Sequence, residues 1–128
     1  MDNIEWESLR YAAINALNNS YSPYSGFSVG CAGLTEDGRV VSGCNIENAS
    51  YGVTMCAENS MIAELFATGG GKLVAFICLN KDEEVIMPCG RCRQLLNEHA
   101  SQSFIMETPK GMATMSDILP LAFSRNDL

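Results

Sequence analysis

The chain has 128 residues, of which 47% are hydrophobic and 18% are charged, a composition typical of one globular domain and unlike that of a disordered chain. Its formal net charge of −7, with eight basic residues that form no run, argues against a nucleic-acid polymer as a partner. The sequence contains no apolar stretch long enough to cross a bilayer, so we expect no membrane partner.

The first part of the chain predicts a helix, a loop and a β-hairpin. Apolar residues recur at helical spacing over residues 4–18, and a segment rich in Ser and Tyr at 19–26 indicates a loop. Two apolar runs, 27–34 and 40–45, flank Asp37-Gly38, and this dipeptide between apolar runs is typical of a hairpin turn.

The remainder predicts helices that alternate with strands. We expect a helix over 54–67 that ends at three glycines, a buried strand over 73–79, and a helix over 89–99. Short strands at 104–107 and 112–115 and a short helix at 116–119 complete the chain. This order predicts an α/β fold in three layers, α/β/α, around a mixed sheet of about five strands. Because no repeat, low-complexity tract or linker interrupts it, residues 1–128 are expected to form a single domain.

Two short segments carry the chemistry: Cys56-Ala57-Glu58 and Pro88-Cys89-Gly90-Arg91-Cys92. Together they offer three thiolates and one carboxylate. A structural zinc site uses four protein ligands, whereas a catalytic site uses three and leaves a position for water. We therefore predict that Cys56, Cys89 and Cys92 bind a catalytic zinc ion, with Glu58 as the proton carrier. Placement at helix N-termini would stabilise the thiolates.

The Cys-x-x-Cys pair alone is also typical of a redox pair or of half a structural zinc site. Neither alternative is favoured, because no second Cys-x-x-Cys exists and His99 is the only histidine. The acidic N-terminus has no apolar run of the signal-peptide kind, which predicts a cytoplasmic protein with reduced thiols. Cys31, Cys44 and Cys78 are interpreted as small buried residues on strands.

The Cys-Ala-Glu and Pro-Cys-x-x-Cys segments resemble the small cytidine deaminases, and the likeness extends over nearly the whole chain, from Tyr21-Ser22-Pro23-Tyr24-Ser25 to Leu119-Pro120-Leu121-Ala122-Phe123. This resemblance implies hydrolytic deamination of cytidine and 2′-deoxycytidine in pyrimidine salvage. It implies one zinc per subunit that acidifies a water, and a Glu58 that carries protons to N3 and to the leaving amine. It also implies a homotetramer whose sites are completed by neighbouring subunits.

The resemblance further implies a set of substrate-binding residues. Asn45 and Glu47 are expected to hold the ribose hydroxyls, which suit one amide and one carboxylate. Phe27 and the backbone of Ala57 are expected to contact the base. Tyr51 is expected to approach the sugar of a neighbouring subunit's ligand, and Phe123 to contact the substrate across a subunit interface. Taken alone, a Phe that opens a strand, as Phe27 does, is more often a core residue, and Phe123 is equally typical of a terminal core residue.

One position departs from the family pattern. Many three-cysteine members carry an Arg immediately after the catalytic Glu, where it contacts the zinc thiolates, but this chain has Asn59. Three thiolates leave a zinc centre net negative unless nearby donors withdraw charge from the sulfurs. We expect Arg91, between two ligands, to supply this donor in place of the usual Arg; otherwise it would be a solvated surface residue.

Two further functions remain as alternatives. A blasticidin-type aminonucleoside deaminase shares Cys-Gly-Arg-Cys-Arg-Gln at residues 89–94, but Glu47 favours cytidine. A zinc-stabilised module that binds single-stranded nucleic acid would need a basic groove, which this acidic chain lacks.

Overall fold

The computed structural model describes residues 3–128, so the first two residues of the acidic N-terminal segment lie outside the described part. Every predicted helix and strand is present, with ends that differ by a few residues. The elements in chain order are α1 (Trp6–Leu17), β1 (Val29–Thr35), β2 (Val40–Cys44), the 3₁₀ turn η1 (Tyr51–Val53), α2 (Ala57–Ala67), β3 (Leu73–Asn80), α3 (Gly90–His99), β4 (Ala100–Thr108), β5 (Gly111–Thr114), α4 (Met115–Ile118) and the 3₁₀ turn η2 (Arg125–Asp127). The two 3₁₀ turns were not predicted, because three residues are too few to show a period.

The strands form one mixed sheet in the order β2-β1-β3-β4-β5. Only β3 and β4 run parallel, and α3 connects them; the other neighbouring strands are antiparallel. The central strand β3 is buried along nearly its whole length, which explains its continuous apolar run. The predicted mixed five-stranded sheet is therefore confirmed.

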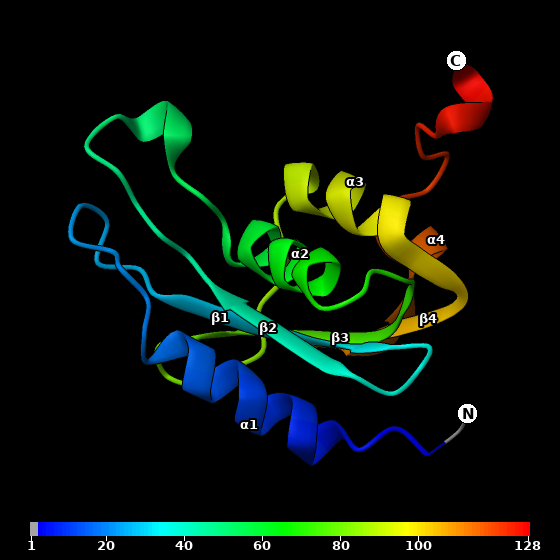
Figure 1. Cartoon of the computed structure of the whole chain (residues 1–128), viewed down its shortest axis with the longest axis horizontal. Helices are drawn as coiled ribbons and strands as arrows, with labels where there is room; N and C mark the ends of the chain where they lie inside the picture. The colour runs from blue at the N-terminus through cyan, green and yellow to red at the C-terminus, as the bar shows by residue number, and fades with distance from the viewer. Residues whose placement is uncertain (1–2) are drawn as a thin grey trace.

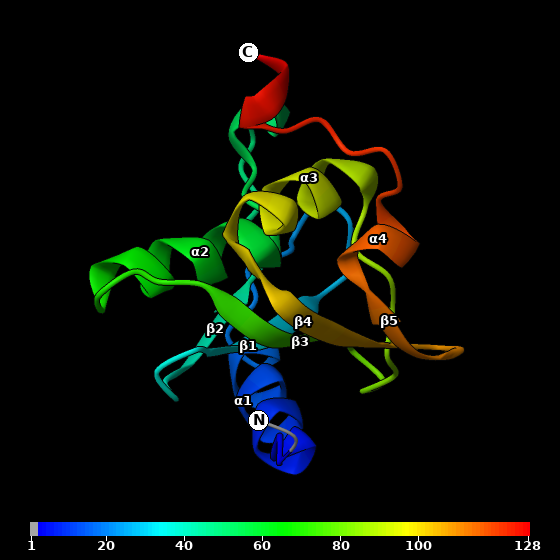
Figure 2. The same cartoon turned by 90° about the vertical axis from the view of Figure 1, so that its right-hand side faces the viewer.

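Helices cover both faces of this sheet, as Figures 1 and 2 show. Helix α1 lies on one face, where Leu9 and Ala13 pack against Ala32, Ile77 and Leu79. Helices α2, α3 and α4 lie on the other face over a larger core, which includes Met61, Leu65, Phe76, Leu96 and Phe104. The predicted α/β/α layering is thus confirmed.

A glycine lets α2 lie directly on the edge strand β2. A Cβ at Gly43 would lie 2.4 Å from the Met61 nitrogen and 2.5 Å from the Ala57 oxygen, closer than real Cβ contacts. The hydroxyl of Ser60 donates to the Cys44 carbonyl at 2.8 Å, and the Glu64 carboxylate accepts from the Ser42 N–H at 2.6 Å. The first turn of α2, which carries Glu58, is therefore held at a fixed position relative to the end of β2.

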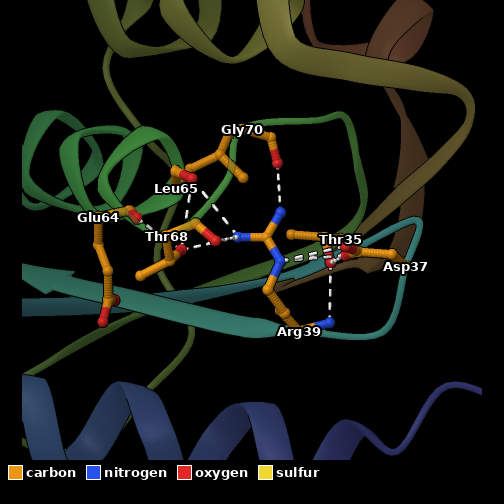
Figure 3. Close-up of polar contacts among 7 residues, drawn as sticks. All are labelled: Thr35, Asp37, Arg39, Glu64, Leu65, Thr68 and Gly70. Carbon is orange, nitrogen blue, oxygen red and sulfur yellow. Dashed lines mark hydrogen bonds and ion pairs between the residues drawn. The ribbon is translucent and has the colours of Figure 1, made fainter.

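The opposite end of α2 is held by Arg39, which follows the hairpin turn (Figure 3). Its guanidinium donates to the Thr68 carbonyl at 3.0 Å, to the Thr68 hydroxyl at 2.7 Å and to the Gly70 carbonyl. Asp37 orients the same guanidinium through an ion pair at 3.2 Å. Because the last carbonyls of a helix lack intrahelical partners, this contact satisfies them and ties α2 to the hairpin.

Two of the three remaining cysteines occupy the positions expected from the sequence. Cys31 and Cys78 are fully buried and lie opposite each other on β1 and β3. Cys44 is only half-buried, contrary to the prediction, because it ends the edge strand β2. Among residues 3–128, no helix combines the length and apolar character that crossing a bilayer requires.

Candidate metal centre and active site

Two helix N-termini bring the three predicted metal ligands together. Cys56 is the N-cap residue of α2, Cys89 is the N-cap residue of α3, and Cys92 lies in the first turn of α3. Their sulfur atoms all lie within 4.8 Å of one another. The predicted helix start at residue 54 was wrong, because residues 54–56 are extended and Met55 pairs with Ile46 instead.

The donor set suits a zinc ion. With Zn–S distances near 2.3 Å, sulfurs in a tetrahedral site lie roughly 3.8 Å apart, which is compatible with this cluster. Among the described residues, no fourth His, Cys, Asp or Glu side chain joins the group. Three protein ligands leave one position open, which is the arrangement of catalytic rather than structural zinc sites.

The local electrostatics differ between the two cysteines of α3. Backbone N–H groups, chiefly that of Cys92, lower the pKa of the Cys89 thiol, as expected at a helix N-terminus. Burial, followed by the charge of Glu58, raises the pKa of the Cys92 thiol. A bound cation would reverse this tendency, because metal coordination deprotonates thiols.

Glu58 is buried, with only 4% of its surface exposed, and it lies in the first turn of α2 beside the thiol cluster. Burial raises the pKa of its carboxyl, opposed by hydrogen bonds from its own N–H and from Cys92. Its side chain lines the same cavity as the three cysteines. A buried carboxylate whose pKa is raised in this way is suited to take up a proton and release it to a bound group.

Arg91 reaches the cluster from the first turn of α3. Its Nη1 atom lies 3.8 Å from the Cys56 sulfur, within hydrogen-bonding range for a sulfur acceptor. The side chain is otherwise exposed. A guanidinium here places positive charge beside one of the three thiolates.

A cavity of about 250 Å³ opens above the cluster. Three of the predicted substrate residues, Phe27, Asn45 and Ala57, line this cavity together with Glu58 and the three cysteines. The remaining lining residues were not predicted from the sequence: Val29, Thr54, Met55, Ile86, Met87 and Pro88. We refer to this space as the base cavity.

A second cavity, of about 380 Å³, adjoins the first and contains two further predicted residues, Glu47 and Tyr51. Its other walls come from Tyr24, Ser25, Asn48 and Thr54. We refer to it as the outer cavity. Among the described residues, only Thr54 lines both cavities.

Most of the hydrogen-bonding groups of the Asn45 side chain are already paired within the protein. Its Oδ1 accepts from the Ser20 hydroxyl and from the Val29 N–H at 3.0 Å, and its Nδ2 donates to the Phe27 carbonyl at 2.8 Å. One amide N–H is left for a ligand. The amide that the sequence assigns to the ribose hydroxyls can therefore act there as a hydrogen-bond donor.

Glu47 keeps its acceptor character. Its Oε1 accepts from the backbone N–H groups of Tyr24 and Ser25 at 2.9 and 3.1 Å, and its Oε2 accepts from the Ser25 hydroxyl. The Ser25 hydroxyl is the main cause of the lowered pKa of this carboxyl. One lone pair of Oε2 stays free to accept from a ligand hydroxyl in the outer cavity.

Phe123 lines neither cavity. Its carbonyl accepts from the side-chain amide of Gln94, a residue of α3, at 2.9 Å, and the residue is 57% exposed. In Figures 1 and 2 the C-terminal tail leaves the body of the molecule beyond α3. The tertiary structure therefore separates Phe123 from the other predicted site residues of its own chain.

The unpredicted lining residues come mostly from two irregular segments. Ile86, Met87 and Pro88 lie on the approach to α3, where the Cys78 thiol donates to the Ile86 carbonyl at 3.0 Å. Pro88 could have been found, because it precedes a metal ligand directly. Thr54, Ile86 and Met87 carry no motif, so only tertiary contacts reveal them.

Comparison with known proteins agrees with this geometry. The profile described as "Cytidine and deoxycytidylate deaminase zinc-binding region" matches residues 5–108. The cytidine deaminase of Mycobacterium tuberculosis is 47% identical over 128 residues, which cover the whole of this chain and 96% of the relative. That of Halalkalibacterium halodurans is 39% identical and covers 91% of this chain and 92% of the relative.

Solved structures give the same result. The crystal structure of cytidine deaminase from Mycobacterium leprae superposes with a TM-score of 0.89 at 53% identity, covering 92% of this chain and 99% of that one. The enzyme from Mycobacterium tuberculosis superposes with a TM-score of 0.91 at 47% identity, covering 95% and 99% of the two chains. These similarities extend over the helices and strands that hold the thiol cluster.

Proposed function

The chain belongs to the cytidine and deoxycytidylate deaminase family, and we propose that it hydrolyses cytidine and 2′-deoxycytidine to uridine and 2′-deoxyuridine with release of ammonia. The observation that carries this proposal is the cluster of three thiols, within 4.8 Å of one another, in one cavity with a buried carboxylate. Pyrimidine salvage is the metabolic role that this reaction serves.

The residues of the base cavity have two roles in the proposed reaction, metal binding and proton transfer. Zinc bound by Cys56, Cys89 and Cys92 would supply Lewis acidity that lowers the pKa of a water to near neutrality. Glu58 accepts one proton from the attacking water and delivers it to N3 of the pyrimidine; it then accepts the second proton, from the hydroxyl group newly attached to C4, and passes it to the departing amine as the C4 carbonyl forms. The raised pKa of its carboxyl suits both transfers.

The remaining residues bind and orient the nucleoside. Phe27 packs on the pyrimidine ring, and the Ala57 backbone contacts the base edge. Asn45 donates its one free amide N–H to the sugar, and Glu47 accepts from a sugar hydroxyl. These roles are supported by the cavity walls and by the hydrogen-bonding capacity left on each side chain.

The charge of the site favours a free nucleoside over a nucleotide. None of the described residues that line the two cavities is Lys or Arg, whereas Glu47 and Glu58 are both acidic. A phosphate group would therefore lack a countercharge and would meet a carboxylate. A blasticidin-type activity is not favoured, because the full-length relatives are cytidine deaminases.

We further propose that the chain assembles as a homotetramer in which Tyr51 and Phe123 approach the substrate of a neighbouring subunit. Both residues are largely exposed, at 75% and 57%, and Leu121, in the same tail as Phe123, is fully exposed. Exposed apolar side chains of this number are typical of surfaces covered by a partner.

One assay tests the proposed activity. Cytidine, 2′-deoxycytidine, cytidine monophosphate and blasticidin S are each incubated with the zinc-loaded protein, and uridine-type products and ammonia are quantified. We expect turnover of the two nucleosides, loss of turnover on chelation of zinc, and recovery when zinc is restored. Preferential turnover of the monophosphate or of blasticidin S would contradict the proposal.

A further inference from the structure

A short antiparallel ribbon connects the metal centre to the outer cavity. The N–H of Ile46 donates to the Met55 carbonyl and the N–H of Met55 donates to the Ile46 carbonyl, both at 2.9 Å. Thr54 and Cys56 have extended backbones, with ψ values of 135° and 157°. On either side of this hydrogen-bonded pair, Asn45 therefore lies opposite Cys56, and Glu47 lies opposite Thr54.

This pairing places four functional side chains in one row. Opposite residues of an antiparallel pair project from the same face, and so do residues two positions apart on one strand. Cys56 and Asn45 therefore share a face with Thr54 and Glu47. The cavity walls agree, because Thr54 lines the base cavity with Asn45 and Cys56 and lines the outer cavity with Glu47.

A nucleoside that extends from Cys56 in the base cavity to Glu47 in the outer cavity must lie beside Thr54. If Glu58 and the thiol cluster take the base, and Glu47 takes a sugar hydroxyl, then the sugar lies across the boundary between the two cavities. Among the described residues, Thr54 forms that boundary. Its side chain is partly buried, so it is accessible from the cavity without being a free surface group.

The Thr54 hydroxyl has an unused donor. Its oxygen accepts from the Asn48 N–H at 3.1 Å, and the hydroxyl donates to no acceptor among residues 3–128. A hydroxyl can donate one hydrogen bond while it accepts another. Resting on the proposed nucleoside deaminase function, we propose that Thr54 is a further substrate-positioning residue, whose hydroxyl donates to a hydroxyl group of the nucleoside sugar between Asn45 and Glu47.

Two substitutions separate the hydroxyl from the shape of the side chain. Thr54→Val keeps the branched shape and removes the donor, so we expect KM for cytidine to rise about 3- to 10-fold with kcat within about twofold. Thr54→Ser keeps the hydroxyl and should hold both constants within about twofold of the parent. Urea unfolding of both variants identifies any general loss of structure.

Nucleoside analogues then separate substrate contact from loop support, since Thr54→Val also removes the acceptor for Asn48. The KM ratio of Thr54→Val to parent is measured for cytidine and for its 2′-, 3′- and 5′-deoxy analogues. We expect the ratio to fall to near 1 for the one analogue that lacks the contacted hydroxyl and to persist for the others.

An equal ratio for all four substrates, or no rise with cytidine, would overturn the role of Thr54. These outcomes differ from failure of the proposed function itself. In that case the parent protein would not deaminate cytidine at all.

Discussion

Glu58 combines the position and the burial that the proposed proton carrier requires. It lies two residues after the metal ligand Cys56, at the start of a helix whose first turn faces the base cavity. The same burial that raises the pKa of its carboxyl also excludes bulk water from proton transfer. Its neighbours in the chain, Ala57 and Asn59, have no comparable ionisable group.

We predict that Glu58→Gln abolishes deamination while zinc stays bound. The amide keeps the size of the side chain but cannot accept the proton, so kcat should fall at least about 100-fold. Zinc content by atomic absorption should remain one ion per chain, because the three thiolates are unchanged. Turnover near the parent level in the zinc-loaded variant would refute the assigned role of Glu58.

Arg91 offers a second test at the scale of one residue. Its guanidinium lies 3.8 Å from the Cys56 sulfur, and we propose that it withdraws charge from an otherwise anionic zinc centre. We predict that Arg91→Ala lowers kcat about 10-fold or more with a smaller effect on KM, and that adding Asn59→Arg restores part of the loss. Zinc affinity, measured by competition with a chelator, should fall in Arg91→Ala.

Arg125→Ala provides a matched control, because it removes an equal charge from a turn near the C-terminus. It should change neither constant appreciably. If Arg91→Ala retained parental turnover and zinc affinity, backbone donors at the two helix N-termini would be sufficient to stabilise the thiolates.

At the scale of elements, the function depends on how closely α2 approaches β2. Because Gly43 has no Cβ, the backbone of α2 can approach β2 more closely than any other residue would allow. The Ser60 hydroxyl adds a hydrogen bond to the last residue of β2. Because Glu58 lies in α2 and Asn45 directly follows β2, the separation of these two residues depends on this contact.

We predict that Gly43→Ala destabilises the protein by about 1–3 kcal/mol, because the added methyl group meets backbone atoms that cannot rotate away. Deamination should weaken in parallel, since α2 must shift. Urea unfolding of the zinc-loaded protein measures the first effect. Gly52→Ala is the control, because nothing lies within 4 Å of a Cβ at Gly52; equal stability losses would argue against close packing as the cause.

The C-terminal end of α3 predicts a dependence of stability on pH. His99 packs edge-on against Phe66, with ring centroids 5.1 Å apart, and partial burial lowers the pKa of its imidazole, with a further lowering by Lys72 opposed by Glu98. Below pH about 6.5 the unfolded chain protonates this histidine while the folded chain still resists protonation. The unfolded state then binds more protons, so stability is lost as pH falls through the folded-state pKa.

We therefore expect the parent to lose more stability between pH 8 and pH 5.5 than His99→Gln does, as measured by urea unfolding at each pH. Effects on the metal thiolates are common to both proteins and cancel in the difference. Parallel pH profiles of parent and variant would show that His99 does not contribute.

At the scale of the whole molecule, two of the regions with exposed apolar side chains bear on the site. One is the loop region that carries Tyr24, Tyr51 and Val53, and the other is the C-terminal tail with Leu121 and Phe123. A monomer would leave both exposed to water. Assembly would bury them and bring Phe123 to a site that its own chain does not allow it to reach.

We predict a solution mass four times the chain mass of 13.9 kDa by light scattering. Phe123→Ala should raise KM for cytidine about fivefold, as expected for loss of an aromatic contact across an interface. Leu128→Ala is the control, since Leu128 is an exposed apolar residue of the same tail. A monomeric parent that deaminates cytidine at full rate would contradict the shared site.

The sequence alone determined the helices and strands, and it identified the three cysteines that the structure brings together. Each helix and strand follows from apolar spacing and from turn residues within a dozen positions, and the two cysteine motifs are equally local. The mixed sheet followed because the order of elements restricts how strands can pair. Boundaries were less certain, as at Thr54, where pairing with the strand across the ribbon outweighed helix propensity.

Only the tertiary structure decided which distant residues share the site. The row of Cys56, Asn45, Thr54 and Glu47 depends on the register of two segments joined by a loop, and register is set by hydrogen bonds between strands rather than by neighbours in the chain. The contact of Arg91 with the Cys56 sulfur likewise depends on the tertiary structure, because the two residues are 35 positions apart in the chain. A local sequence pattern specifies a helix or strand because the interactions that stabilise it join residues close together in the chain. A binding site is assembled by contacts between different helices, strands and loops, and the spacing of residues along the chain does not reveal those contacts.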